Sequence, residues 1–427
     1  MFKKYRWLVV VTLFLAMLIN YLDRSALSIA APLLVKEFNL TPSEMGMVFS
    51  SFFVGYAVFN LIGGYIADKY GARIVLAASM VIWSLFCGLT TMATGLTSLL
   101  VIRFFFGVGE GPIAAATNKL VYNWFPTSER TRAMSYALSG VPLGSAVAGP
   151  IVGLLTSSFG WKIAFWILVV LGLAWTALFL SKVKETPADS GRVSAEELQE
   201  ISAGQALKMV DGVAEADDDS LPWNHYLRKP IVLAAGLGYF AHSYVLFFFL
   251  SWFPTYLMQA KGLSLKEMSI ATVVPWLVGT MGFVFGGHIA EYVLLKTGNV
   301  YLTRKLTTVV SSLVVAACVG IAGVVETTAS ALALSGIALF AMYVAIPNFW
   351  GIVQDNVHGK QVGLVGGFIH FISNISGVIA PFVTGMIVQK TGGFMGSFLV
   401  AAGVVIVGAI LLFIFVRADK PKAQLAK

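Results

Sequence analysis

Residues 162–182 read KIAFWILVVLGLAWTALFLSK, an apolar run with a lysine at each end and no charge between them. An α-helix needs about 20 such residues to cross a bilayer. Lipid offers no hydrogen bonds to exposed backbone, and the strands of a membrane barrel would alternate in short pieces. The sequence therefore predicts an all-α polytopic membrane protein with twelve transmembrane helices. The other eleven apolar segments lie at about 7–35, 45–67, 74–92, 97–121, 133–157, 230–259, 268–292, 306–325, 330–352, 362–389 and 393–416.

The composition of the chain excludes most soluble classes of protein. Of its 427 residues, 58% are hydrophobic and 12% are charged, whereas a soluble domain has about 45–50% apolar and about 25% charged residues. The net charge of +8 does not require nucleic acid as a partner, because a polytopic membrane protein explains it better. Cys87 and Cys318 both lie in apolar runs, which predicts neither a disulfide framework nor a metal site. The sequence has no phosphate-binding Gly-Lys-Ser/Thr loop and no nucleophile elbow, so we expect neither ATP-driven transport nor an enzyme, and no cofactor.

Basic residues are distributed unequally between the two sides of the predicted membrane. With the N-terminus inside, two of the 29 basic residues, Arg24 and Arg103, lie within spans, and most of the others lie inside. This asymmetry is the one that the positive-inside rule describes. We therefore expect a multi-pass plasma-membrane protein, in a bacterial inner membrane, with both termini cytoplasmic. The basic residues in external segments are Lys36, Lys162, Lys261, Lys266 and Lys390.

A polar stretch from about residue 183 to 228 divides the predicted spans six and six. Its residues 194–197 (SAEE) are a plausible capping-box start for a short polar helix, and an acidic run follows at 217–219. We predict an N-terminal six-helix bundle over residues 1–182, a cytoplasmic linker over 183–228 and a C-terminal six-helix bundle over 229–427. We interpret the linker as a solvated connection between the halves, with a regulatory site as the alternative.

The two halves look like weak repeats of each other. GGYIAD at residues 63–68 follows the second span as GGHIAE at 286–291 follows the eighth. Gly-Pro at 149–150 in the fifth span has a counterpart in Ala-Pro at 380–381 in the eleventh. A duplicated six-helix unit leaves a cleft between its two copies, and a substrate would sit in that cleft.

Ionisable residues lie near the middle of two predicted spans, where lipid makes them costly. Asp23 and Arg24 lie in the first span, and Arg103 and Glu110 share one face of the fourth, about 10 Å apart along its axis. A charge at mid-bilayer costs at least about 2.5–3.5 kcal/mol, so such residues usually face the bundle interior or an aqueous cavity. They either hold helices together as ion pairs (Asp23 with Arg103, or Arg24 with Glu110) or form a proton relay whose arginine can bind a carboxylate substrate.

Several motifs together resemble the major facilitator superfamily. They are NYLDR at residues 20–24, GYIADKYGAR at 64–73, RFFFGVGEGP at 103–112 and NWFP at 123–126. More narrowly, they resemble its anion:cation symporter family, which includes bacterial galactonate, glucarate and hexuronate transporters and vesicular glutamate and sialic-acid transporters. FFLSWFPTYL at 248–257 looks like the bacterial sugar-acid branch. The similarity runs nearly end to end and implies two pseudo-symmetric six-helix bundles that work by alternating access, which we expect to function as a monomer.

The resemblance implies a role for each matching residue. Asp23 and Glu110 match the family's proton-coupling carboxylates, and Arg103 matches the arginine expected to pair with Asp23. Arg24 is expected to bind the substrate carboxylate. The further expected substrate-binding residues are Tyr21, Tyr56, Trp350, His370 and Asn374.

Two positions depart from the pattern of the sugar-acid members. A glutamine of the fifth span appears as Val141, and an asparagine of the eleventh span appears as His370. Fewer amide partners for hydroxyl groups make an aldonate a weaker fit. His370 could restore one hydrogen bond, or it could carry a charge and select a second anionic group. His242, His370 and Asn374 either line the cleft or are packing residues.

We expect a secondary active transporter that carries an organic anion, a sugar acid or another hydroxy-carboxylate, with protons, driven by the proton gradient. The alternatives in the same fold are an organic-anion facilitator or antiporter, or a symporter of an aromatic or other small carboxylate. A rival from another class is a membrane sensor that uses the linker as its output. Charges at cytoplasmic helix ends are expected to hold a gate closed without touching the substrate: Asp68, Arg73, Glu129, Arg130 and Arg132.

Overall fold

The computed structural model describes residues 4–210, 223–357 and 361–417, and every regular element in these ranges is a helix. The acidic run at 217–219 lies outside the described residues. The first helices are α1 (Arg6–Phe38), α2 (Pro42–Tyr70), α3 (Ala72–Leu89), the short η1 (Thr90–Met92), α4 (Leu96–Glu110), α5 (Ile113–Trp124), α6 (Thr127–Leu138), α7 (Gly140–Phe159) and α8 (Trp161–Lys182). They are followed by α9 (Ala195–Val210), α10 (Trp223–Leu227), α11 (Pro230–Gln259), α12 (Leu265–Ala271), α13 (Val273–Thr297), α14 (Val300–Ala322), α15 (Thr328–Asn356), α16 (Gln361–Thr391) and α17 (Met395–Phe415).

The spanning helices confirm the predicted fold class. In the described ranges, eleven helical segments are long and apolar enough to cross a membrane. The bent helix α2 makes a twelfth, because its parts Pro42–Asn60 and Ile62–Tyr70 meet at 53° and pass the same test together. Six of these spans precede α9 and six follow it.

Three of the predicted spans are broken rather than continuous helices. The span predicted at 97–121 is made of α4 and α5, which are separated at Gly111-Pro112. Proline has no backbone N–H and disfavours helix for the residue before it, so the break lies where the sequence demands one. The span containing α6 and α7 is interrupted at Ser139, and the span containing α12 and α13 at Thr272.

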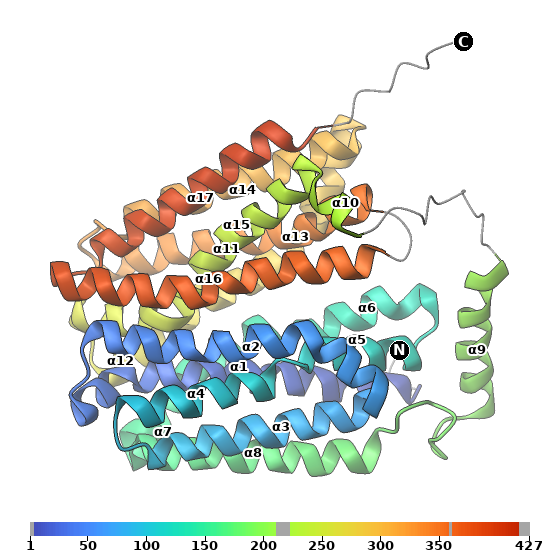
Figure 1. Ribbon diagram of the computed structural model, residues 1–427, viewed down its shortest axis with the longest axis horizontal. Coiled ribbons are helices and arrows are strands. Elements are labelled where there is room, and N and C mark those ends of the chain that lie inside the picture. The colour runs from blue at the N-terminus through green and yellow to red at the C-terminus, as the bar shows by residue number, and fades with distance from the viewer. Residues whose placement is uncertain (1–3, 211–222, 358–360, 418–427) are drawn as a thin grey trace.

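The spanning helices lie in two groups, α1–α8 and α11–α17, as Figure 1 shows. Between the groups, α2 packs on α16, α1 on α11, and α7 on α12 and α13. Within each group, corresponding helices meet through glycine: Gly107 of α4 lies on the backbone of α2 at Phe52, and Gly282 of α13 lies on the backbone of α15 at Phe340. This is the packing expected of a repeated six-helix unit.

The two groups are in direct contact at the end of the molecule that we call the closed face. A β-carbon on Gly46 of α2 would come within 2.7 Å of the Pro381 carbonyl oxygen of α16. The indole of Trp252 of α11 donates to this same oxygen at 2.9 Å and lies 5.6 Å from the ring of Phe49 of α2, centroid to centroid. The Ser43 backbone N–H donates to Gln389 Oε1 at 3.2 Å. These contacts close the space between the two groups of helices at this end.

The opposite end of the molecule, which we call the terminal face, is open. The start of α1 and the end of α17 lie there (Figure 1). A cavity of about 730 Å³, which we call the vestibule, opens between the two groups of helices at this end. Its lining includes Asp68, Asn118 and Arg130 from the first group and Phe283 and Gln354 from the second. The structure is therefore the conformation that opens toward the terminal face.

The polar helix predicted in the linker forms as α9, and it is bound to the first group of helices rather than free in solvent. The Ser194 hydroxyl accepts from the Glu197 N–H at 3.2 Å, which confirms the predicted helix start. The Glu197 carboxylate turns away from α9 and caps α1 instead, accepting from the backbone N–H of Tyr5 at 2.9 Å and of Arg6 at 3.0 Å. A carboxylate at this position accepts hydrogen bonds from N–H groups that have no partner within the helix. Its negative charge is also attracted to the positive end of the helix dipole.

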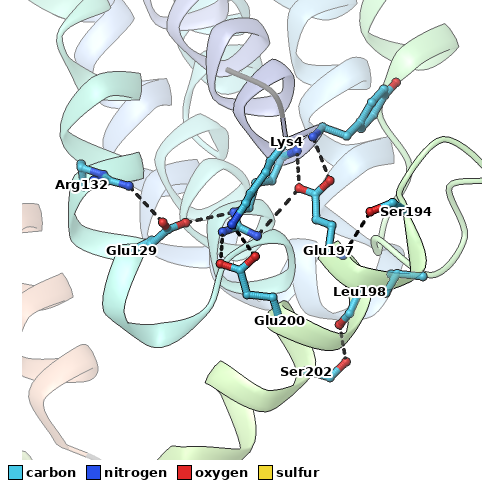
Figure 2. Close-up of polar contacts among 10 residues, drawn as sticks. Lys4, Glu129, Arg132, Ser194, Glu197, Leu198, Glu200 and Ser202 are labelled. Atoms are coloured by element: carbon cyan, nitrogen blue, oxygen red, sulfur yellow. Dashed lines mark hydrogen bonds and ion pairs between the residues drawn. The ribbon is translucent and has the colours of Figure 1, made fainter. Parts of the chain in front are cut away.

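A buried arginine, Arg6, joins α1, α6 and α9 at the terminal face. Figure 2 shows its partners Glu129 and Glu200. The Arg6 side chain is 0% exposed. Its Nε lies 2.9 Å from Glu129 Oε2 of α6, and its Nη2 lies 2.8 Å from Glu200 Oε1 of α9. Hydrogen bonds from the side chains of Arg6 and Lys4 lower the pKa of Glu200 to about 2 from the ordinary 4.5 of a glutamate. The linker interpreted as a solvated connection is thus anchored to the first half.

Replacing this arginine should loosen the linker helix. Arg6→Gln removes the cation shared by Glu129, Glu197 and Glu200. Two of these carboxylates are partly exposed, so we expect a loss of about 1.5–3 kcal/mol. We expect a lower melting temperature in detergent and faster proteolysis within residues 183–210. Lys4→Gln is the matched control, because its ion pair with Glu200 is exposed and contributes at most about 1 kcal/mol. Equal losses in the two variants would show that burial of Arg6 is not what holds α9.

Candidate functional site

Two of the four predicted intramembrane charges form a buried ion pair. Arg24 of α1 is 6% exposed and Glu110, the last residue of α4, is 0% exposed. Arg24 Nε donates to Glu110 Oε2 at 3.0 Å, and Arg24 Nη2 contacts the same oxygen. Glu110 Oε1 has no hydrogen-bond partner among the described residues. The pair therefore uses one carboxylate oxygen twice, and the Asn20 side chain also interacts with this carboxylate.

Three aromatic rings surround the guanidinium of Arg24. Its Cζ lies 4.7 Å from the ring centroid of Tyr21 and 4.8 Å from those of Phe52 and Tyr56. Ring faces attract a desolvated cation, so they stabilise Arg24 and fix the plane of its guanidinium. Of the predicted substrate residues, Tyr21 and Tyr56 are thus brought together with Arg24.

The expected pairing of Asp23 with Arg103 is wrong in this conformation. No ion pair within 4.0 Å joins them in the described part of the chain. Asp23 Oδ2 instead accepts from the indole N–H of Trp83 at 3.1 Å, and Arg103 lies over the ring of Phe106 at 4.3 Å.

The physical reason is helix geometry. Neighbouring residues point about 100° apart around a helix axis. Arg24 is paired with Glu110 of α4, so Asp23 is directed to a different neighbour, Trp83 of α3. Asp23 Oδ1 and Arg103 Nε are both buried, and neither has a hydrogen-bond partner among the described residues. All four residues nevertheless lie in one buried region, as the sequence predicts.

The second group of helices contributes an aromatic and amide cluster. The His370 ring lies 6.0 Å from that of Trp350 and 6.1 Å from that of Tyr239, centroid to centroid. Asn374, one turn after His370, donates from Nδ2 to the His370 carbonyl oxygen at 2.8 Å. Arg24 of the first group is the charged side chain whose field reaches His370. Trp350, His370 and Asn374 are therefore brought together, and they face the Arg24 region across the two halves.

Tyr239 and Asn60 belong to this cluster although the sequence interpretation did not include them. Tyr239 stacks on Phe349 with ring centroids 5.5 Å apart. The Asn60 amide oxygen lies 3.2 Å from His370 Nδ1 and joins the two halves. The signal that could have found Asn60 is an amide in an otherwise apolar span, at the residue where α2 bends.

His242 is a packing residue in this structure. Its ring is 1% exposed, Nδ1 lies 3.0 Å from the Gly238 carbonyl oxygen one turn earlier, and the ring centroid lies 5.0 Å from that of Phe349. Of the two alternatives left open for His242, the structure favours packing.

The predicted gating residues all lie near the terminal face and bind within the first group of helices. Asp68 pairs with Lys119 at 2.8 Å. Arg73 donates to the carbonyl oxygens of Val183 and Leu180 at 2.6 and 2.7 Å, which caps the end of α8. Arg130 donates to the Phe125 and Tyr122 carbonyl oxygens, each at 3.2 Å. Asp68 and Arg130 line the vestibule, and Arg73 does not.

Comparisons with known proteins agree with this architecture. The model of the family described as Major Facilitator Superfamily matches residues 13–381. A "Hexuronate transporter" of Bacillus subtilis (strain 168) is 43% identical over 98% of this chain and 96% of its own length. A "Probable galactarate/D-glucarate transporter" of Escherichia coli (strain K12) is 31% identical over 99% of this chain and 97% of its own. A solved bacterial homologue of the human lysosomal transporter Spinster, inward-facing and occupied, superposes with a TM-score of 0.77 over 96% of each chain at 18% identity, which shows a shared fold.

The pairing seen here predicts which charges are energetically coupled. Arg24→Gln or Glu110→Gln leaves one buried charge without its partner, at a cost of about 3–5 kcal/mol, whereas the double variant removes both charges. Melting temperatures should therefore show two large single losses and a partial recovery in the double variant. Asp23 and Arg103 form no ion pair within 4.0 Å in the described chain, so the double variant Asp23→Asn with Arg103→Gln should recover less stability than the first double variant does. If the Asp23/Arg103 double variant recovers stability and the Arg24/Glu110 double variant does not, this assignment is reversed.

Proposed function

Because the chain belongs to the Major Facilitator Superfamily, a family of membrane transporters, we propose that it carries a hexuronate into the cell together with protons. The single observation that carries this proposal is the buried Arg24–Glu110 pair enclosed by three aromatic rings. The relative named as a hexuronate transporter shares 43% of its residues with nearly the whole chain, which favours a sugar acid with one carboxylate. The other residues that would complete the site are Asp23, Arg103, Tyr21, Tyr56, Trp350, His370 and Asn374.

Arg24 is the proposed anchor for the substrate carboxylate. A guanidinium presents a planar fork that matches a carboxylate bidentately. In this conformation Glu110 holds that fork with one oxygen. Substrate and Glu110 would therefore compete for the same cation, and a substrate can bind Arg24 fully only when Glu110 gives it up.

Protonation of Glu110 would release Arg24. The proton can be taken by Oε1, which has no hydrogen-bond partner in the described chain. A neutral carboxylic acid attracts the guanidinium much less than a carboxylate does, so the arginine becomes free to bind an anion. Proton and anion would then enter the site together, which is the coupling that symport requires.

Alternating access would expose this site to one side of the membrane at a time. We place the terminal face, with both termini, in the cytoplasm of a bacterial cell, so the vestibule would be the exit path for substrate. Asp68, Arg73 and Arg130 would then lie at the cytoplasmic helix ends, which come together when the other conformation closes the terminal face. The working unit is proposed to be a monomer.

Arg24→Lys should already impair substrate binding, because an ammonium is a point donor and cannot replace the fork. We expect the dissociation constant for D-galacturonate or D-glucuronate to rise at least about tenfold, and further in Arg24→Ala. Isothermal titration of purified protein measures both. Arg192→Lys, on the exposed linker, is the matched control and should bind as wild type does. Near-wild-type affinity in both Arg24 variants would remove Arg24 as the anchor.

Glu110→Gln should separate exchange from accumulation. The amide cannot release a proton, so hexuronate counterflow in liposomes should persist while uphill uptake driven by a proton gradient is lost. Substrate should also raise the melting temperature of this variant more than that of wild type, because the bound carboxylate supplies Arg24 with the missing partner. Uphill uptake that survives in Glu110→Gln would move coupling to Asp23. Wild-type uptake without proton movement would favour a facilitator or antiporter.

A further inference from the structure

The side chain of Asn60 connects the two halves of the molecule at the point where α2 bends. Its Nδ2 lies 3.3 Å from the carbonyl oxygen of Gly111, the residue that follows Glu110. Its Oδ1 lies 3.2 Å from Nδ1 of His370 on α16. One amide group is thus shared between the broken span that carries Glu110 and the cluster of the second half.

This arrangement fixes which nitrogen of His370 carries a proton. The Gly111 carbonyl can only accept, so the NH₂ end of Asn60 must face it and the amide oxygen must face His370. An amide oxygen also only accepts. His370 Nδ1 must therefore donate, and the neutral ring then has a bare lone pair on Nε2.

The other tautomer would place two lone pairs 3.2 Å apart, between Asn60 Oδ1 and His370 Nδ1. Asn374 is the more distant partner for Nδ1, because its Nδ2 lies 3.4 Å away whereas Asn60 Oδ1 lies at 3.2 Å. No carboxylate of the described residues lies within ion-pair distance of His370, so no anion there holds a second proton on the ring.

The Nε2 atom of His370 is available to a ligand. It has no hydrogen-bond partner among the described residues, and unlike Nε2 of His242 it is not sealed from solvent. The ring is half-buried beside Trp350 and Tyr239, within the field of Arg24. The site therefore offers a donor fork at Arg24 and a hydrogen-bond acceptor at His370.

We propose that Asn60, by holding His370 as an acceptor, makes the site select sugar acids with one carboxylate over those with two. This rests on the proposed function, in which Arg24 takes the first carboxylate. A hydroxyl group at the far end of a hexuronate can donate to Nε2. The second carboxylate of a hexarate, such as galactarate, has no proton to donate and would face a lone pair, so the same position rejects it. Asn60 is a positioning residue, and His370 is the group that touches substrate.

Asn60→Asp tests this assignment because a carboxylate in place of the amide would hold a second proton on the ring and turn Nε2 into a donor. Dissociation constants for D-galacturonate and galactarate are measured by titration of the full-length protein in detergent. We expect wild type to prefer the monocarboxylate at least about tenfold, and Asn60→Asp to lower that preference at least about tenfold. Asn118→Asp is the matched control, because it adds the same charge in the vestibule without contact to His370, and should leave the ratio unchanged.

A second measurement reads the tautomer directly in the wild-type protein. The chain has five histidines, so ¹⁵N spectra of histidine-labelled protein are simple, and His370→Gln identifies the signal. The expected result is a protonated Nδ1 and an unprotonated Nε2 for His370. The opposite tautomer, a doubly protonated ring, or an unchanged ratio in Asn60→Asp would overturn the inference. If wild type binds neither sugar acid, the proposed function fails, and the tautomer spectrum alone decides the role of Asn60.

Discussion

A charge that cannot reach water must find its partner inside the protein, and in this molecule the Arg24–Glu110 ion pair meets that constraint. Both groups are buried at the interface of α1 and α4, and three aromatic rings exclude water from the cation. In a dry site a cation and an anion cannot separate without replacement partners. Any step that parts them must therefore supply a proton to Glu110 and an anion to Arg24. In the proposed mechanism this requirement couples the proton and the substrate anion at one ion pair, without a path through distant residues.

The close packing of α2 on α4 makes this arrangement possible. Gly55 of α2 and Gly107 of α4 bring the two backbones into contact, and on one side of that seam Phe52 and Tyr56 reach Arg24. Asn60 lies one turn further along α2 and reaches Gly111 and His370. A side chain at either glycine would push the helices apart, because the nearest neighbours are backbone atoms that cannot rotate away. One helix thus positions the rings around the anchor and the amide beside the histidine.

The sequence alone was sufficient for features that depend on local properties. Span length and the cost of buried charge predicted the twelve helices and the gathering of Asp23, Arg24 and Glu110. It could not predict that Asp23 binds Trp83 rather than Arg103, because that choice depends on the rotation of α1 relative to α3 and α4. It also missed the binding of α9 at Arg6. In the sequence Arg6 is not distinguished from the other basic residues near the N-terminus, because its three carboxylate partners are distant in sequence.

The separation of Asp23 from Arg103 gives the two intramembrane carboxylates different surroundings, and therefore different tasks in the proposed mechanism. Glu110 shares its arginine with the substrate, so its charge must change when an anion binds. Asp23 is held by a neutral indole N–H, and Arg103 lies against an aromatic ring, so neither loses its present partner when substrate reaches Arg24. In the proposed mechanism a proton on Asp23 would therefore respond to the charge of Glu110 and not to contact with substrate. A carrier that must keep protons from crossing alone needs a carboxylate whose charge changes when substrate binds, and in the proposed mechanism that carboxylate is Glu110.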